Sequence, residues 1–394
     1  MRPALTDEIC PIAKTCGCCQ YADVGYHTQT AEKEKALQEC FKGLPLSLPM
    51  LTPDDPTHYR NKVHRVISPG KKGGIIAGNY YPGTHRVVPV SQCLIEDRKA
   101  AEIADAAVRL AFEFHLKPYD EDRGTGFLRH VLVRVGVNTG EILLILVTAS
   151  PVFPGKNHFV RALCTAHPEI TSIVLNVNAK DTTMVLGKET HTLFGPGFIT
   201  DRIGNMTYRL SASAFYQVNP AMTKKLYDTV LDFAKLSGRE TVLDAYSGVG
   251  TIGLYLSPHA QSVIAVELNP DAVRDAFKNA RLNKAGNIRF IQDDATEYLK
   301  KLAASGSHID VLVLDPPRSG STESFIASVR KLAPDRVVYV SCNPETLVRD
   351  LKLFARQGYR TEAVKPCDMF PFTRHAESVA LITRDRARQQ NDCH

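Results

Sequence analysis

The stretch from Val242 to Leu254 constrains the fold of this chain more than any other. Its sequence, VLDAYSGVGTIGL, begins with an apolar run that predicts a buried strand ending at Asp244, and its last residues have the spacing of a helix start. Between them Gly248, Gly250 and Gly253 let the backbone turn tightly and approach a ligand. The pattern predicts a nucleotide-binding strand, turn and helix, for either NAD or the adenosyl part of S-adenosylmethionine.

The C-terminal half continues this alternation of strands and helices. Apolar runs predict strands at 262–266, 288–292, 310–314 and 336–340, and a helix from about 270 to 283. Such alternation is typical of an α/β, doubly wound, Rossmann-like sheet, which binds its ligand at the carboxyl ends of the strands. Those ends carry polar residues: Asp244, Glu267, Asp293, Asp294, Asp315 and Cys342.

The strand ends favour S-adenosylmethionine over NAD. Glu267 can accept hydrogen bonds from the ribose of either cofactor. A dehydrogenase has no evident use for the rigid DPPR loop at 315–318 together with a cysteine at the next strand end, whereas a methyltransferase must hold an acceptor base. Cys342 precedes Asn343 and Pro344, which suit the cap and first position of a helix whose dipole favours a thiolate. An inert buried cysteine is the alternative.

Cysteines gather near the N-terminus of the chain. The longest apolar run, 142–147, is too short to span a bilayer, so we expect a cytoplasmic protein with reduced thiols and no membrane partner. The spacing of Cys10, Cys16, Cys19 and Cys93 then suits zinc or a 4Fe-4S cluster, since both take four soft ligands. Ordinary thiols are the alternative.

The N-terminal half has the pattern of an α+β, β-rich domain. Helical composition covers 28–44 and 100–115. Alternating segments predict strands at 62–67, 74–81, 130–137, 141–148 and 173–177. We therefore expect two domains, 1–205 with the cysteine cluster and 206–394 with the glycine loop of the methyltransferase site, with 28–58 packed on the second.

A basic patch lies between Pro56 and Ile95, where the chain has no acidic residue. Cations bind phosphates and aromatic rings stack on unpaired bases, so the mixture predicts a surface for single-stranded RNA. A solvated basic face is the alternative. The patch contains Arg60, Lys62, Arg65, Lys71, Lys72 and Arg86, interleaved with Tyr59, Tyr80, Tyr81 and three histidines.

Five motifs resemble those of the RNA (uracil-5-)-methyltransferase family. They are FYQVNP (215–220), DAYSGVGTIG (244–253), LDPPRSG (314–320), YVSCNPETLVRDL (339–351) and DMFPFTRHAE (368–377). The front half is also similar, in CPIAKTCGCCQY (10–21), YRNKV (59–63) and LRHVLVR (128–134). The resemblance implies an enzyme that transfers a methyl group from S-adenosylmethionine to C5 of a uridine in RNA.

The resemblance also implies roles for individual residues. Cys342 would be the nucleophile that adds to uracil C6, and Glu377 the base that removes the C5 proton. The cofactor site would comprise Gln217, Tyr246, Thr251, Glu267, Asp294 and Asp315. A 4Fe-4S cluster would be held by Cys10, Cys16, Cys19 and Cys93, while Cys18 stands where the family motif usually has glycine.

We expect a monomer that acts on ribosomal rather than transfer RNA. The family usually carries an additional N-terminal β-barrel, and here nine residues precede Cys10, so RNA affinity would come from the basic patch. Two rival functions are an amino-group methyltransferase of the N6-adenine type, which also uses a DPP loop, and a non-catalytic iron-sulfur RNA-binding protein. The amino-group enzymes normally have an aromatic residue where this chain has Arg318, and they need no cysteine nucleophile. The presence of both Cys342 and Glu377 disfavours the non-catalytic protein.

Overall fold

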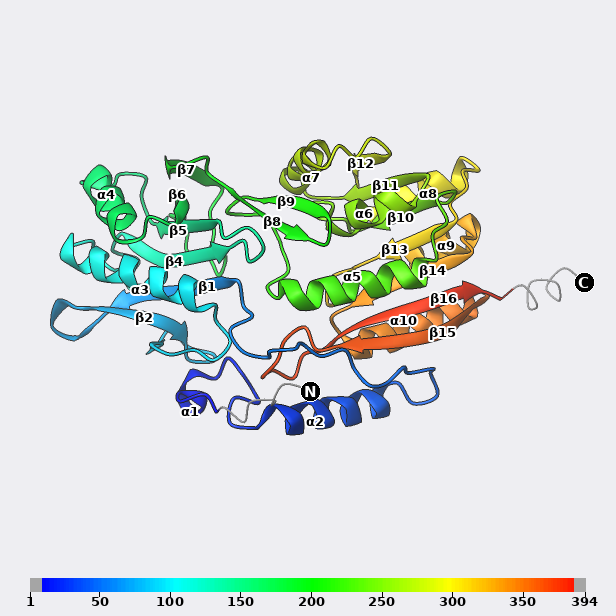
Figure 1. Cartoon of the computed structure of the whole chain (residues 1–394), viewed down its shortest axis with the longest axis horizontal. Coiled ribbons are helices and arrows are strands. Elements are labelled where there is room, and N and C mark those ends of the chain that lie inside the picture. Colours follow the sequence, from blue (N-terminus) through cyan, green and yellow to red (C-terminus); the bar gives the residue numbers. More distant parts are fainter. Residues whose placement is uncertain (1–8, 386–394) are drawn as a thin grey trace, which may run out of the picture.

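The computed structural model describes residues 9–385, which form two seven-stranded sheets and a two-stranded hairpin. Figure 1 shows the two large sheets next to each other, the N-terminal one in blue to green and the C-terminal one in green to red. The N-terminal segment, in dark blue, runs beneath both. None of the helices within 9–385 has the length and apolar character needed to cross a membrane.

The C-terminal sheet has the strand order β12-β11-β10-β13-β14-β16-β15. The first five are parallel where they pair, and β16 and β15 close the edge in antiparallel fashion. The order reverses direction between β10 and β13, which is where doubly wound sheets open a crevice for a ligand. The strands are β10 (Thr241–Ala245), β11 (Ser262–Glu267), β12 (Ile288–Gln292), β13 (Val311–Leu314), β14 (Arg336–Ser341), β15 (Tyr359–Cys367) and β16 (Glu377–Arg384).

Helices cover both faces of this sheet and join its strands. Asp244 does not end β10, because the strand continues to pair with both neighbours through Ala245. The helices are α5 (Pro220–Ala234), α6 (Thr251–Leu256), η2 (Ser257–His259), α7 (Pro270–Leu282), α8 (Ala295–Ala304), α9 (Glu323–Leu332) and α10 (Pro344–Arg356).

The N-terminal sheet has the order β3-β2-β1-β4-β5-β6-β7. One face packs on α3 (Arg98–Glu113) and α4 (Lys156–Ala166), with Val63 and Ile67 in that core. The opposite face contributes Leu132 to the core shared with the catalytic half. The strands are β1 (Lys62–Pro69), β2 (Ile75–Tyr80), β3 (Val87–Pro89), β4 (Leu128–Val135), β5 (Ile142–Thr148), β6 (Ile170–Val177) and β7 (Glu189–Phe194), with η1 (Lys71–Gly73) between β1 and β2.

Two connections join the halves. The hairpin of β8 (Ile199–Ile203) and β9 (Met206–Leu210) contains the expected domain boundary at 205/206 in its turn. The N-terminal segment carries α1 (Ala13–Cys16) and α2 (Tyr26–Cys40) and then runs along the outer edge of β15. There the backbone N–H groups of Ser47 and Leu51 donate to carbonyls of β15 at 2.8 and 2.9 Å.

A buried ion pair fixes α2 to the C-terminal sheet. The ammonium of Lys33 lies 2.6 Å from a carboxylate oxygen of Asp368, and both side chains are almost fully buried. The hydroxyl of Tyr26 donates to the other oxygen of Asp368 at 2.7 Å. Burial leaves this carboxylate no water to bind, so its two partners satisfy it and tie the segments together.

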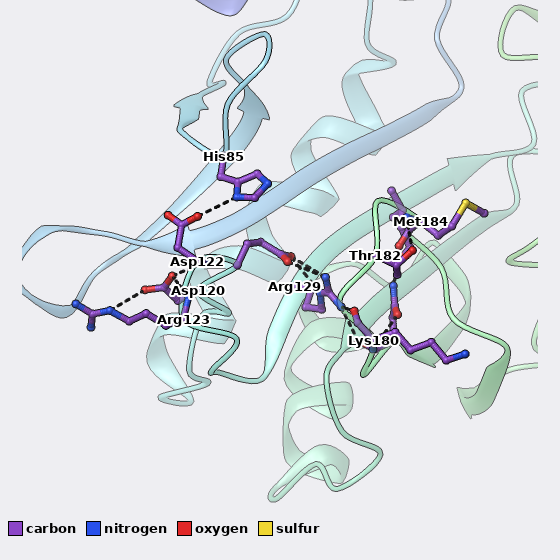
Figure 2. A network of polar contacts seen from close by, with 11 residues as sticks. His85, Asp120, Asp122, Arg123, Arg129, Lys180, Thr182 and Met184 are labelled. Atoms are coloured by element: carbon purple, nitrogen blue, oxygen red, sulfur yellow. Dashed lines mark hydrogen bonds and ion pairs between the residues drawn. The ribbon is translucent and has the colours of Figure 1, made fainter.

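Arg129, near the start of β4, ties two loops of the N-terminal half together (Figure 2). Its guanidinium contacts both carboxylate oxygens of Glu121 at 2.8 to 3.1 Å and donates to the carbonyls of Asn178 and Lys180 at 2.8 and 2.7 Å. The side chain is only 1% exposed. Its charge is therefore fully paired inside the protein.

Candidate active site

A cavity of about 590 Å³ opens at the carboxyl ends of the parallel strands, around the switch point between β10 and β13. Most of the residues expected at the cofactor and base site line it: Gln217, Tyr246, Thr251, Glu267, Asp315, Cys342 and Glu377. Asp294 is not among the lining residues. Its carboxylate instead caps α8, accepting from the backbone N–H groups of Thr296 and Glu297 at 2.9 and 3.1 Å.

The glycine loop shapes one wall of the cavity. Gly250 has φ = +81°, and a Cβ there would lie 2.8 Å from the ring of Phe290. A Cβ on Gly253 would lie 2.8 Å from the carboxylate of Asp244, which accepts a hydrogen bond from the N–H of Gly253 at the same distance. Only glycine fits at either position. The backbone thereby brings the start of α6 against the end of β10.

Glu267 is held in place by the backbone around it. Its two carboxylate oxygens accept hydrogen bonds from the N–H groups of Gly248 at 2.9 Å and Asn269 at 2.7 Å. These contacts leave further lone pairs on the carboxylate for hydroxyl donors, because an ionised carboxylate offers about four acceptor positions. The geometry suits a residue that accepts hydrogen bonds from the ribose of a nucleotide.

Cys342 lies between the end of β14 and the start of α10. Asn343 caps α10 by accepting from the N–H of Glu345, and Pro344 is its first residue, which confirms the predicted helix start. The pKa of the Cys342 thiol is nevertheless raised, first by burial and then by the carboxyl groups of Glu377 and Asp315. Burial and the neighbouring acids therefore act against the thiolate, in the direction opposite to the helix dipole.

Three acidic side chains, Asp244, Asp315 and Glu377, line the same cavity. Burial raises the pKa of Asp244 to about 8, that of Asp315 to about 7 and that of Glu377 to about 8. The charge of Asp315 adds to the shift of both other groups. One oxygen of Asp244 is buried without a hydrogen-bond partner in the described part of the chain. A cation placed among these groups would favour their ionised forms.

Side chains of α10 form hydrogen bonds with the residues that follow the DPPR loop and so fix its position. The buried carboxylate of Asp350 accepts from the N–H of Ser321 at 2.7 Å and from the hydroxyl of Tyr339 at 2.6 Å. Arg349 donates to the same carboxylate and to the carbonyls of Ser319 and Ser321. Because Cys342 stands at the start of the same helix, this network sets the position of the loop relative to the thiol.

Three residues with no assigned role in the sequence analysis also line the cavity. Phe215, from the FYQVNP segment, is 70% exposed and offers an open aromatic face at the mouth. The charge of Arg318 offsets part of the rise in the pKa of Glu377 and of Cys342. His375 lies two residues before Glu377. All three lie inside motifs that the sequence analysis identified, and this position was the only sequence feature that could have indicated that they belong to the site.

A second cavity, of about 400 Å³, adjoins the first. Cys10, Cys16, Cys18, Cys19 and Cys93 line it together. No group of three or more metal-binding side chains within residues 9–385 is arranged around a single-ion position. Each thiolate of a 4Fe-4S cluster binds a different iron, so its ligands stand further apart than those of one zinc ion. The five cysteines share one cavity wall, and the described residues show no metal site that would distinguish a cluster from zinc.

The basic patch is divided between the surface and the interior. Arg65 is 1% exposed and forms a bidentate ion pair with Glu96 at 2.7 and 2.8 Å, with Asp105 at 3.2 Å as a further partner. The expectation that Arg65 contacts RNA is therefore wrong, because its charge is paired in the core. Lys71 and Arg86 are exposed, and Arg86 lies over the ring of Tyr81.

Comparison with known proteins agrees with this geometry. Residues 172–385 match the family model described as tRNA (Uracil-5-)-methyltransferase. The chain is 41% identical over 385 residues to an uncharacterised RNA methyltransferase of Halalkalibacterium halodurans, covering 96% of this chain and 84% of that protein. It is 39% identical over 386 residues to another from Clostridium acetobutylicum, with 96% and 84% covered.

A solved structure is similar over nearly the whole chain. It is the tRNA (uracil-54, C5)-methyltransferase of Pyrococcus abyssi in complex with S-adenosyl-L-homocysteine, with a TM-score of 0.78, 25% identity and coverage of 93% of this chain and 85% of that one. The fold and site thus define an S-adenosylmethionine-dependent α/β RNA methyltransferase. The chain belongs to the tRNA (uracil-5-)-methyltransferase family.

Proposed function

We propose that the protein methylates C5 of a loop uridine in RNA through a covalent adduct between Cys342 and uracil C6. The observation that carries the proposal is the meeting of Cys342, Glu377 and Asp315 in one cavity beside the glycine loop. S-adenosylmethionine, when bound, supplies the methyl group. The target base must leave its stack to reach the cavity, which costs least for a base already in a loop.

The side chains divide the chemistry between them. C5 of uracil is a weak nucleophile, so the Cys342 thiolate first adds to C6 and turns the ring into an enolate whose C5 accepts the methyl group. Glu377 then takes the proton from C5, the electron pair restores the C5–C6 double bond, and the thiolate leaves. Glu377 must be ionised for its step, so its raised pKa places the rise of activity on the alkaline side of neutrality.

We further propose that Cys10, Cys16, Cys19 and Cys93 hold a 4Fe-4S cluster. The four thiols line one cavity wall and come from the N-terminal segment and from the loop after β3. A cluster bound there would join these segments covalently. Because the site does not exist in the unfolded chain, its binding would add to the stability of the fold.

The substrate proposed from the sequence resemblance is ribosomal RNA, and transfer RNA is the second pool to assay, because the Pyrococcus abyssi enzyme is named for a tRNA uracil. The test is mass spectrometry of both RNA pools from cells with and without the gene. Loss of 5-methyluridine from one ribosomal position is expected. Loss from transfer RNA alone would move the substrate, and loss of a methyl group from an exocyclic nitrogen would contradict C5 chemistry.

A further inference from the structure

Three basic side chains, those of Arg60, Lys62 and Arg134, lie at the face of the N-terminal sheet that is turned toward the catalytic half. We call this group the basic floor. Lys62 on β1 is directly opposite Arg134 on β4, so both project from the same face. The guanidinium of Arg134 reaches across and donates to the carbonyl of Ala214 at 2.6 Å. Ala214 precedes Phe215, so these cations lie beside the aromatic residue at the mouth of the active-site cavity.

Two histidines lie on the same face and are uncharged at neutral pH, because burial lowers the pKa of His64 to about 4 and that of His130 to about 3. The rings of His64 and His130 meet edge to face, with centroids 5.0 Å apart. The Nε2 of His64 and the Nδ1 of His130 are buried and have no hydrogen-bond partner in the described part of the chain, and the same holds for Nε of Arg134. Buried nitrogens without partners are rare in native proteins, and a cluster of them points to a ligand that completes their contacts.

No acid neutralises this floor. Within residues 9–385, the side chains of Arg60 and Lys62 form no ion pair with a carboxylate. Burial first, and the charges of Arg134 and Arg60 second, together lower the pKa of Lys62 to about 8. Glu96 is the one acidic residue lining the adjoining cysteine cavity, and Arg65 already holds both of its oxygens. The floor is positive, and an anion would relieve the repulsion within it.

The floor connects to the active site through the cavities. Arg60 and His64 line the cysteine cavity. Both cavities share the lining residues Phe215, Gln217, Arg318, Phe370 and His375. In addition, the backbone N–H of Asn61 donates to the carbonyl of Val218 at 3.0 Å, so the segment carrying Arg60 and Lys62 is hydrogen-bonded to the loop carrying Phe215 and Gln217.

We infer that Arg60, Lys62 and Arg134 form a binding site for an RNA backbone phosphate next to the uridine that enters the active-site cavity. This inference deepens the proposed function and rests on it for the identity of the RNA. A phosphodiester supplies negative charge opposite these cations and acceptor oxygens for their N–H groups, including the unpaired Nε–H of Arg134. The base attached to that phosphate is left beside Phe215, where its ring can stack.

A lysine that serves RNA binding and a lysine that stabilises the fold should differ in their effect on the stability of the RNA-free protein. A partly buried ammonium repelled by two guanidinium groups destabilises the fold, so replacing Lys62 by a neutral residue should preserve or raise thermal stability. If Lys62 serves RNA, the same replacement should weaken RNA binding. If Lys62 had only a structural role, its replacement would lower thermal stability and RNA binding together.

The test compares Lys62→Gln with Lys71→Gln, which removes the same charge from the exposed turn at the far end of β1. The probe is a short fluorescent oligouridylate, titrated over a range of salt concentrations. Lys62→Gln should weaken binding about tenfold at low salt, the effect of losing one charge-assisted hydrogen bond, and lower the salt slope by about 0.7, the value for one phosphate contact of a single strand. Lys71→Gln should change both less, and Lys62→Arg should restore the wild-type slope.

Controls separate this inference from the proposed function. S-adenosylmethionine affinity and the melting temperature of Lys62→Gln should match or exceed those of wild type, and Arg60→Gln provides a second variant should Lys62→Gln not fold. Unchanged affinity and slope in Lys62→Gln and Arg60→Gln, while wild type still forms 5-methyluridine, would overturn the phosphate site alone. A reduced slope in an enzyme whose product is not 5-methyluridine would retain the site and reject the proposed reaction.

Discussion

Replacing Glu377 by glutamine should make the protein more stable at alkaline pH. Glu377 is 4% exposed, and its pKa rises from an ordinary 4.5 to about 8, mainly through burial and secondly through the charge of Asp315. The folded protein therefore keeps a proton on Glu377 that the unfolded chain has already lost between these two pKa values. The free energy of unfolding must fall as pH rises through this window.

The size of the effect follows from the shift. Each pKa unit corresponds to about 1.4 kcal/mol, so a rise from 4.5 to about 8 removes on the order of 4 to 5 kcal/mol of stability once Glu377 is ionised. Glutamine has the shape of the protonated acid and cannot ionise. Between pH 5 and pH 9 the stability gap between Glu377→Gln and wild type should widen by on the order of 4 kcal/mol.

Urea unfolding followed by circular dichroism at several pH values measures this gap. Asp315→Asn is a matched variant, and its gap should stop widening about one pH unit earlier because the pKa of Asp315 is about 7. Glu32→Gln removes an exposed carboxylate of α2 and should track wild type. Parallel stability curves for Glu377→Gln and wild type across this range would refute the idea that burial holds Glu377 protonated.

Three further predictions concern the chemistry. Cys342→Ala should abolish both methylation and the covalent RNA complex. Glu377→Gln should methylate once and then stall as a covalent adduct that is visible on a denaturing gel. Full turnover by Glu377→Gln would assign the role of general base to another residue. Calorimetry should show that S-adenosylmethionine affinity rises between pH 6 and pH 8, by up to about tenfold per pH unit for each proton released. The reason is that the sulfonium cation favours the ionised forms of Asp244, Asp315 and Glu377. The affinity for S-adenosylhomocysteine, which lacks this cation, should change less. Anaerobically purified protein should contain about four irons per chain, and stoichiometric zinc without iron would contradict the cluster.

The sequence predicted the parallel strands well because most are short apolar runs, and those inside the sheet, such as β13, are fully buried. β12 and β13 lie within a residue of their expected bounds. The antiparallel edge was not predicted: β15 mixes exposed and buried residues and contains Pro366, so it lacks a clear period. β7 is exposed along most of its length and has no apolar pattern to detect. Pairing with a neighbouring strand, which is a long-range property, defines both of these strands.

Local sequence placed the site residues but could not assign their environments. A polar residue at a strand end can face the ligand, as Glu267 does, or cap the following helix, as Asp294 does, and both occupy the same position in the pattern. The helix start after Cys342 was predictable from Asn343 and Pro344. The raised pKa of Cys342 was not, because Glu377 and Asp315 reach it from other strands of the sheet.

The basic patch shows where strand periodicity could have added information. Successive residues of β1 face opposite sides of the sheet, so Lys62 and His64 share one face and Arg65 lies on the other. That alternation separates the cations into two sets, but it does not say which set is paired. The answer depends on Glu96 and Asp105, whose carboxylates meet Arg65 only because α3 and the loop before it fold over that face. The opposite face meets the catalytic half, and within residues 9–385 Lys62 forms no ion pair with a carboxylate there, whereas Arg65 has two acidic partners. This asymmetry makes Lys62, rather than Arg65, the residue to test against RNA.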